Sequence, residues 1–150
     1  MSHPLPNRLS LMVLEIDPDY LRLEIIMADG AFGGRVDVYE QPDLPDVLAV
    51  LLRGFPVSPA DQREVTLGSF DPSHAGGGIR LVFRCTDRAG HAIVDAELED
   101  SPSDGGPVRS VRLAMTVEPS AIDTFVGQLS GWTPAVGERR SLLGTPSDGD

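Results

Sequence analysis

The sequence predicts a single α+β domain, built on a mainly antiparallel sheet of about six to seven strands with two amphipathic helices. Three observations predict this class. Most apolar residues alternate with polar ones, which is the period of a half-buried strand. Two segments instead place apolar residues three and four positions apart, which is the period of a helix. Short runs of Gly, Pro, Asp and Ser join the segments and are typical of turns between antiparallel neighbours.

The first part of the chain predicts three consecutive strands. Residues 9–17 and 21–30 are separated by Pro18 and Asp19, which form a turn signal. Residues 33–41 repeat the alternating pattern after a Gly-rich turn. These segments are expected to pair as an antiparallel meander.

Two helices are predicted, one in the middle of the domain and one at its end. The first lies within residues 43–56, with Asp43 as N-cap and Gly54 as C-terminal stop. Its apolar stripe consists of Leu44, Val47, Leu48 and Leu51. The second lies within residues 118–131, and its stripe consists of Ile122, Phe125, Val126 and Leu129.

Four more strands are predicted between the helices, at residues 64–70, 79–85, 91–100 and 108–118. The full order is therefore β-β-β-α-β-β-β-β-α. In a two-layer domain, the helices would cover one face of the antiparallel sheet. A β-sandwich with the two helices at its edges is the alternative.

The domain is expected to occupy residues 9–132. Residues 1–8 contain two prolines and are expected to form a flexible N-terminal arm. Residues 133–150 are rich in Gly, Pro and Ser and are expected to form a flexible C-terminal tail. A chain of 150 residues can bury a substantial core without disulfides or metal.

The charge balance narrows the classes of partner. The net charge is −11, which disfavours nucleic acid and anionic membranes, because both need a basic face. An acidic protein instead suits a basic protein partner. No apolar run reaches about 18 residues and the first residues lack a signal-peptide core, so a cytoplasmic protein is expected.

The segment "SFDPSHAGGGIR" (69–80) is the strongest candidate for a reactive loop. It brings Asp71, Ser73 and His74 together before three glycines. A catalytic triad rarely forms within one loop, and a phosphate-binding loop would place a helix, not a strand, after the glycines. A turn followed by a mobile hairpin connection is the favoured interpretation, and no catalytic residue is assigned.

Metal, cofactor and thiol chemistry are not expected. A metal site would need His74, His91 and Asp71 to converge, and their spacing matches no metal-binding motif. Cys85 lies in an alternating apolar run and is expected to be a buried structural thiol.

An acidic strand is the candidate partner-binding surface. Glu97, Glu99, Asp100 and Asp104 follow one another along the strand at 91–100 and into the next loop. Arg84 and Arg112 on neighbouring strands would neutralise part of this surface. Tyr39 and Trp132 are the candidate exposed aromatic residues, although Trp132 equally suits a cap of the last helix.

Several motifs in residues 32–132 resemble those of a group of small bacterial proteins. They are "FGG", "GSFDP" followed by "GGG", and "AGHA". The chain thereby resembles WapI-type immunity proteins, which neutralise polymorphic toxins by binding them. The resemblance implies a protein that sequesters a partner and carries no catalytic residues over to this chain.

Three functions follow as hypotheses. The favoured one is a non-enzymatic binding module, an immunity-type inhibitor of a cognate toxin. The second is a small-ligand binder or hydrolase that uses the loop of Asp71, Ser73 and His74. The third is an oligomerising protein that pairs through an exposed strand edge, so that a monomer and a homodimer both stay open.

Overall fold

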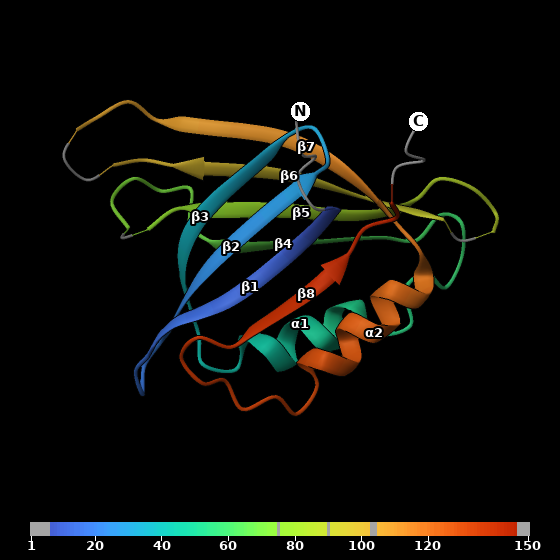
Figure 1. Cartoon of the computed structure of the whole chain (residues 1–150), viewed down its shortest axis with the longest axis horizontal. Helices are drawn as coiled ribbons and strands as arrows, with labels where there is room; N and C mark the ends of the chain where they lie inside the picture. Colours follow the sequence, from blue (N-terminus) through green and yellow to red (C-terminus); the bar gives the residue numbers. More distant parts are fainter. Residues whose placement is uncertain (1–6, 75, 90, 103–104, 147–150) are drawn as a thin grey trace, which may run out of the picture.

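Eight antiparallel strands form two four-stranded sheets in the computed structural model, which describes residues 7–74, 76–89, 91–102 and 105–146 (Figure 1). Sheet A has the order β3-β2-β1-β8, and sheet B has the order β4-β5-β6-β7. The strands of sheet A are β1 (Asn7–Ile16), β2 (Leu21–Asp29), β3 (Gly33–Glu40) and β8 (Arg139–Leu143). The strands of sheet B are β4 (Gln62–Gly68), β5 (Gly78–Cys85), β6 (Ala92–Asp100) and β7 (Arg109–Val117).

The two sheets come together at β3 and are held apart at their other side by the helices. β3 lies across sheet B and contacts all four of its strands (Figure 1). On the far side, α2 (Pro119–Leu129) packs on β8 and on α1 (Leu44–Leu52). The Arg63 guanidinium of β4 donates hydrogen bonds to the carbonyl oxygens of Leu51 and Arg53, at the end of α1. The helices therefore close the gap between the edges of the two sheets.

The core fills the space between the sheets and the helices as one cluster. Alternation along each strand supplies it, because successive side chains point to opposite faces. Its largest fully buried side chains include Phe83 of β5 and Phe125 of α2. The stripe predicted for α2 is buried in full. In α1, Leu44 and Leu48 of the predicted stripe are buried, but Leu51 is only partly buried and Val47 is exposed. Ala49 and Leu52 are buried in the core instead.

The predicted fold class is confirmed: the protein is a single α+β domain with two helices, and its first nine elements follow the predicted order. Two details differ. The strands of the described residues number eight and divide into two sheets that face each other, with the helices at their edges, so the arrangement is the β-sandwich given as the alternative and not one sheet covered by helices. An eighth strand, β8, pairs with β1 inside the segment expected to be a tail.

The predicted boundaries also shift at both ends. Asn7 and Arg8, assigned to the arm, belong to β1 and pair with β2. Residues 139–143, assigned to the tail, form β8, whose Leu142 is fully buried. Residues 1–6 and 147–150 lie outside the described residues. A five-residue strand with one buried side chain has too weak a pattern to be recognised from its period alone.

Candidate functional site

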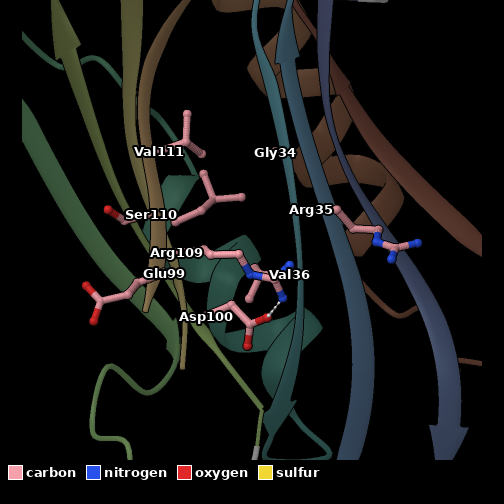
Figure 2. Close-up of a pocket in the computed structure, with 9 residues that line it drawn as sticks. Gly34, Arg35, Val36, Glu99, Asp100, Arg109, Ser110 and Val111 are labelled. Atoms are coloured by element: carbon pink, nitrogen blue, oxygen red, sulfur yellow. Dashed lines mark hydrogen bonds and ion pairs between the residues drawn. The ribbon is translucent and has the colours of Figure 1, made fainter. Parts of the chain in front are cut away.

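The predicted acidic surface is divided between two faces of sheet B. Glu97 and Glu99 lie on the outer face, away from sheet A. Asp100 is the next residue and points the other way, toward β3, where its Oδ2 lies 3.0 Å from Arg109 Nη2 (Figure 2). Asp104 lies outside the described residues. Side-chain alternation along a strand therefore prevents these residues from forming one patch.

Cross-strand arginines pair with most carboxylates on the outer face of sheet B. Arg112 Nε lies 2.7 Å from Glu97 Oε2. Arg84 Nε lies 2.6 Å from Asp95 Oδ2. Arg80 makes two hydrogen bonds, of 2.8 and 3.0 Å, with the carboxylate of Glu64, and they lower the pKa of that carboxyl. The predicted neutralisation by Arg84 and Arg112 is confirmed, and Glu99 is the one β6 carboxylate on this face without an ion pair to a described residue.

A groove lies between β3, an edge strand of sheet A, and the β6–β7 hairpin. One part has a volume of about 300 Å³, and its lining includes Val36, Val111 and the Asp100–Arg109 ion pair (Figure 2). A second part of about 270 Å³ continues past Tyr39 and shares Val36 and Asp100 with the first. Of the charged residues along the groove, Arg35 and Glu99 direct their side chains away from it in Figure 2. The others form two ion pairs, Arg22–Asp37 and Arg109–Asp100, so their charges compensate each other.

The loop of Asp71, Ser73 and His74 is an exposed turn. Asp71 Oδ1 accepts hydrogen bonds from the Ser73 amide, at 2.9 Å, and from the Ser73 hydroxyl, at 2.8 Å. These bonds lower the pKa of the Asp71 carboxyl. His74 Nδ1 lies 3.4 Å from Asp71 Oδ2 and 3.4 Å from Ser69 Oγ. The Ser73 hydroxyl thus donates its hydrogen bond to the Asp71 carboxylate. In a Ser-His-Asp relay it would donate to the imidazole instead.

The glycines after this turn dock on β3. The Gly77 amide donates to the Asp37 carbonyl at 2.8 Å, and the Gly77 carbonyl accepts from the Ser69 amide at 3.1 Å. The Gly68 amide donates to Glu40 Oε2 at 2.6 Å, and burial raises the pKa of that carboxyl. This end of the loop is a joint between the sheets, not the free hairpin connection that the sequence predicts.

The two histidines considered for a metal site do not converge. His74 precedes β5 and His91 follows it, so the eight residues of that strand separate them. His91 instead lies between Asp87 and Glu118. Within the described ranges, no three His, Cys, Asp or Glu side chains are grouped closely enough to hold a metal ion. The Cys85 thiol is partly buried, which raises its pKa, and it lies 3.6 Å from the Ser58 carbonyl oxygen.

The two candidate aromatic residues have different surroundings. Trp132 Nε1 donates to Glu138 Oε1 at 3.0 Å, and the Arg140 guanidinium lies 4.4 Å from the ring centroid, so this ring joins the end of α2 to β8. Tyr39 lies at the end of β3, is 38% exposed, and packs against Tyr20 with ring centroids 5.5 Å apart. Sequence reasoning missed Tyr20, although the β2–β3 register predicts that a residue just before β2 lies beside the end of β3.

Three carboxylates lie near Tyr20, in β1 and in the β1–β2 turn. Glu15 Oε2 accepts a hydrogen bond from the Tyr20 hydroxyl at 2.9 Å, which raises the pKa of Tyr20. Asp17 and Asp19 lie in the adjoining β1–β2 turn. None of the three carboxylates forms an ion pair with a described residue. We call Glu15, Asp17, Asp19, Tyr20 and Tyr39 the tyrosine end.

No protein-family model matches the chain, and no solved structure matches it significantly. Among the described residues, neither α1, with nine residues, nor α2, with eleven, reaches the length of a membrane-spanning helix.

Proposed function

We propose that this protein is a non-enzymatic protein-binding module, an immunity-type inhibitor that sequesters a basic bacterial toxin. The tyrosine end is the observation that carries the proposal. It combines an ordered aromatic pair with carboxylates that have no cationic partner among the described residues. The immunity assignment rests on the resemblance of residues 32–132 to WapI-type immunity proteins. In this proposal the protein acts in the cytoplasm, as a monomer or a homodimer, and binds no nucleic acid.

The tyrosine pair suits an anchor at the centre of an interface. Tyr39 packs against the Tyr20 ring and lies close to the backbone of Gly76, where a Cβ atom would lie 3.1 Å from the Tyr39 ring. The Tyr20 hydroxyl is held by Glu15. Rings that are ordered before binding lose little conformational entropy, which is one reason that Tyr is enriched at binding hot spots.

The charges favour a basic partner at this end. The net charge of −11 attracts cationic proteins over a long range and speeds their encounter. On the outer face of sheet B, arginines compensate the carboxylates locally. At the tyrosine end, Arg22 is the cross-strand neighbour of Glu15 and Tyr39 but pairs with Asp37, and Glu15, Asp17 and Asp19 form no ion pair with a described residue. Arg or Lys side chains of a partner can also lie over the tyrosine rings. We therefore place the docking surface here, with the β6 surface of Glu97 and Glu99 as its competitor.

The test begins with the partner. A tagged copy of the protein is used to capture proteins from its native bacterium, and each captured protein is identified and purified. A basic protein that inhibits growth when expressed alone, and no longer does so when co-expressed with this protein, is the expected result. Capture of acidic proteins only, or no relief of growth inhibition, would refute the immunity function.

Association kinetics with the purified partner then locate the surface. Asp17→Asn with Asp19→Asn, and Glu97→Gln with Glu99→Gln, each remove two negative charges. We expect the first pair to slow association more, with a difference that shrinks as salt screens the charges over a Debye length of about 8 Å at physiological ionic strength. If the second pair slowed association more than the first, the docking surface would be the β6 surface of Glu97 and Glu99.

A pair of aromatic substitutions provides the matched control. Tyr39→Ala is expected to weaken binding about tenfold or more, because it removes the proposed anchor. Phe32→Ala removes an aromatic side chain that is 68% exposed on the β2–β3 turn and is expected to change binding little. If the two substitutions changed the binding affinity equally, the tyrosine end would not be part of the interface.

A further inference from the structure

We propose that His91 is a proton-dependent clamp between the β5–β6 hairpin and the beginning of α2. Its ring lies between two carboxylates that belong to different elements. Nδ1 is 2.6 Å from Asp87 Oδ2, in the hairpin. Nε2 is 3.6 Å from Glu118 Oε2, on the residue directly before the first residue of α2, Pro119.

The chemistry of imidazole makes this arrangement sensitive to one proton. A neutral ring carries a single N–H, so only one of its nitrogens can donate. A neutral His91 that donates to Asp87 turns the lone pair of Nε2 toward Glu118, which repels it. The protonated ring carries an N–H on each nitrogen, so it donates a hydrogen bond to Asp87 and attracts the Glu118 carboxylate through its charge. Protonation therefore decides whether Glu118 is held or released.

Backbone hydrogen bonds hold the parts that the clamp connects. Asp87 Oδ1 accepts from the amides of Ala89, at 2.9 Å, and His91, at 3.2 Å. The Thr86 amide closes the hairpin by donating to the His91 carbonyl at 2.8 Å. On the other side, the Glu118 carbonyl accepts from the amides of two residues in the first turn of α2, Ala121 at 3.0 Å and Ile122 at 3.3 Å. Because Ile122 is fully buried, a change at Glu118 acts on a turn that is anchored in the core.

The charged groups around the ring favour its protonated form. The hairpin contributes Asp87, which faces Nδ1, and its neighbour in the chain is Arg88. The beginning of α2 contributes Glu118, which faces Nε2. The hydrogen bond with Asp87, then the charges of Asp87 and Glu118, raise the pKa of His91 against a smaller opposing effect of desolvation.

The sign of the pH dependence follows from the two shifts. Because the pKa of His91 is raised in the folded protein, its stabilisation is complete below the pKa of an unfolded histidine and is lost as pH rises through the folded value. The hydrogen bond with His91 lowers the pKa of Asp87, so the contribution of Asp87 is lost as pH falls through its own folded value. The clamp is closed between these two titrations.

Nuclear magnetic resonance of the isolated protein provides the test. The pKa of His91 is measured in the wild type, in Glu118→Gln and in His74→Gln. Hydrogen exchange of the Ala121 and Ile122 amides is followed across the same pH range and corrected for the intrinsic rate. We expect Glu118→Gln to lower the pKa of His91, and His74→Gln to leave it unchanged because His74 lies at the other end of β5.

The exchange data test the coupling to α2. Protection of the Ala121 and Ile122 amides is expected to fall about two- to five-fold as His91 loses its proton, the range that a partly exposed ion pair supports. In His91→Gln, the same amides are expected to keep one level of protection throughout. The clamp would be overturned if Glu118→Gln left the pKa of His91 unchanged. It would also be overturned if, in the wild type, the protection of these two amides stayed constant while His91 titrates. Glu118→Gln retains the His91 signal, so the proposal stays testable even if His91→Gln disturbs the hairpin.

Discussion

At the scale of single residues, two glycines set how closely β3 approaches sheet B. A Cβ atom on Gly34 would lie 2.7 Å from Val111 Cγ1 and 3.2 Å from Leu98 Cδ2. A Cβ atom on Gly77 would overlap the Val36 side chain and lie 2.5 Å from the Glu99 carbonyl oxygen. The glycine run therefore has a structural explanation, which is close packing of a backbone joint against β3.

This explanation predicts opposite effects at two glycines. Gly77→Ala is expected to destabilise the protein by about 1–3 kcal/mol, the usual cost of overpacking, because backbone atoms cannot move aside like a flexible side chain. Gly127, in the interior of α2, has open space where a Cβ atom would lie, so Gly127→Ala is expected to stabilise by up to about 1 kcal/mol through helix propensity. Urea denaturation measures both. Equal stability of Gly77→Ala and the wild type would show that the joint is loose.

At the scale of elements, β8 shows how a weakly patterned segment becomes a strand. Only Leu142 of its five residues is fully buried. Its other stabilising contacts are the pairing with β1 and a hydrogen bond to α2, in which the Gln128 side-chain oxygen accepts from the Ser141 amide at 3.2 Å. The Gln128 carbonyl also accepts from Arg140 Nε at 3.3 Å. These partners are distant in sequence, so the local pattern of apolar residues cannot predict the contacts with them.

Neighbouring leucines test whether β8 is part of the core. Leu142 is fully buried, whereas Leu143 is 62% exposed. Leu142→Ala is expected to cost about 2–5 kcal/mol, the range for a buried leucine, and Leu143→Ala about 0.5 kcal/mol or less. Thermal and urea denaturation give both values. If the two substitutions cost the same, this segment behaves as the tail that its composition predicts.

At the scale of the whole molecule, most arginines form ion pairs, and an excess of acidic residues remains. Seven arginines form ion pairs with carboxylates among the described residues, most of them across strands. The excess of acidic residues, 23 against 12 basic ones, remains after these pairs are formed. Repulsion among the excess charges opposes the compact state.

Salt should therefore stabilise the protein. Raising the salt concentration from about 0.01 M to about 0.15 M shortens the Debye length from about 30 Å to about 8 Å, which screens the repulsion between distant carboxylates more than it weakens ion pairs in contact. We expect the melting temperature to rise over this range at pH 7, measured by circular dichroism at constant protein concentration. A falling melting temperature would mean that the cross-strand ion pairs outweigh the repulsion.

The sequence by itself determined the class of the fold, the two helices and the first seven strands, because each of these elements has its own apolar period. The full burial of the α2 stripe shows how reliable that signal is when every position faces the core. The same local information identified the arginines that pair with the β6 carboxylates, since cross-strand neighbours follow from hairpin register. In α1, the helical period alone misplaced part of the buried stripe, since Val47 was predicted to be buried and is exposed.

Only the tertiary structure decided how these elements meet. The division into two sheets, the pairing of β8 with β1, and the docking of Gly77 on β3 all depend on contacts between residues far apart in the chain. The tyrosine end and the His91 cluster arise in the same way, from turns and strand ends that the fold brings together. Periodicity reports which side of an element is buried but not which partner buries it, because that choice is made by the packing of the whole core.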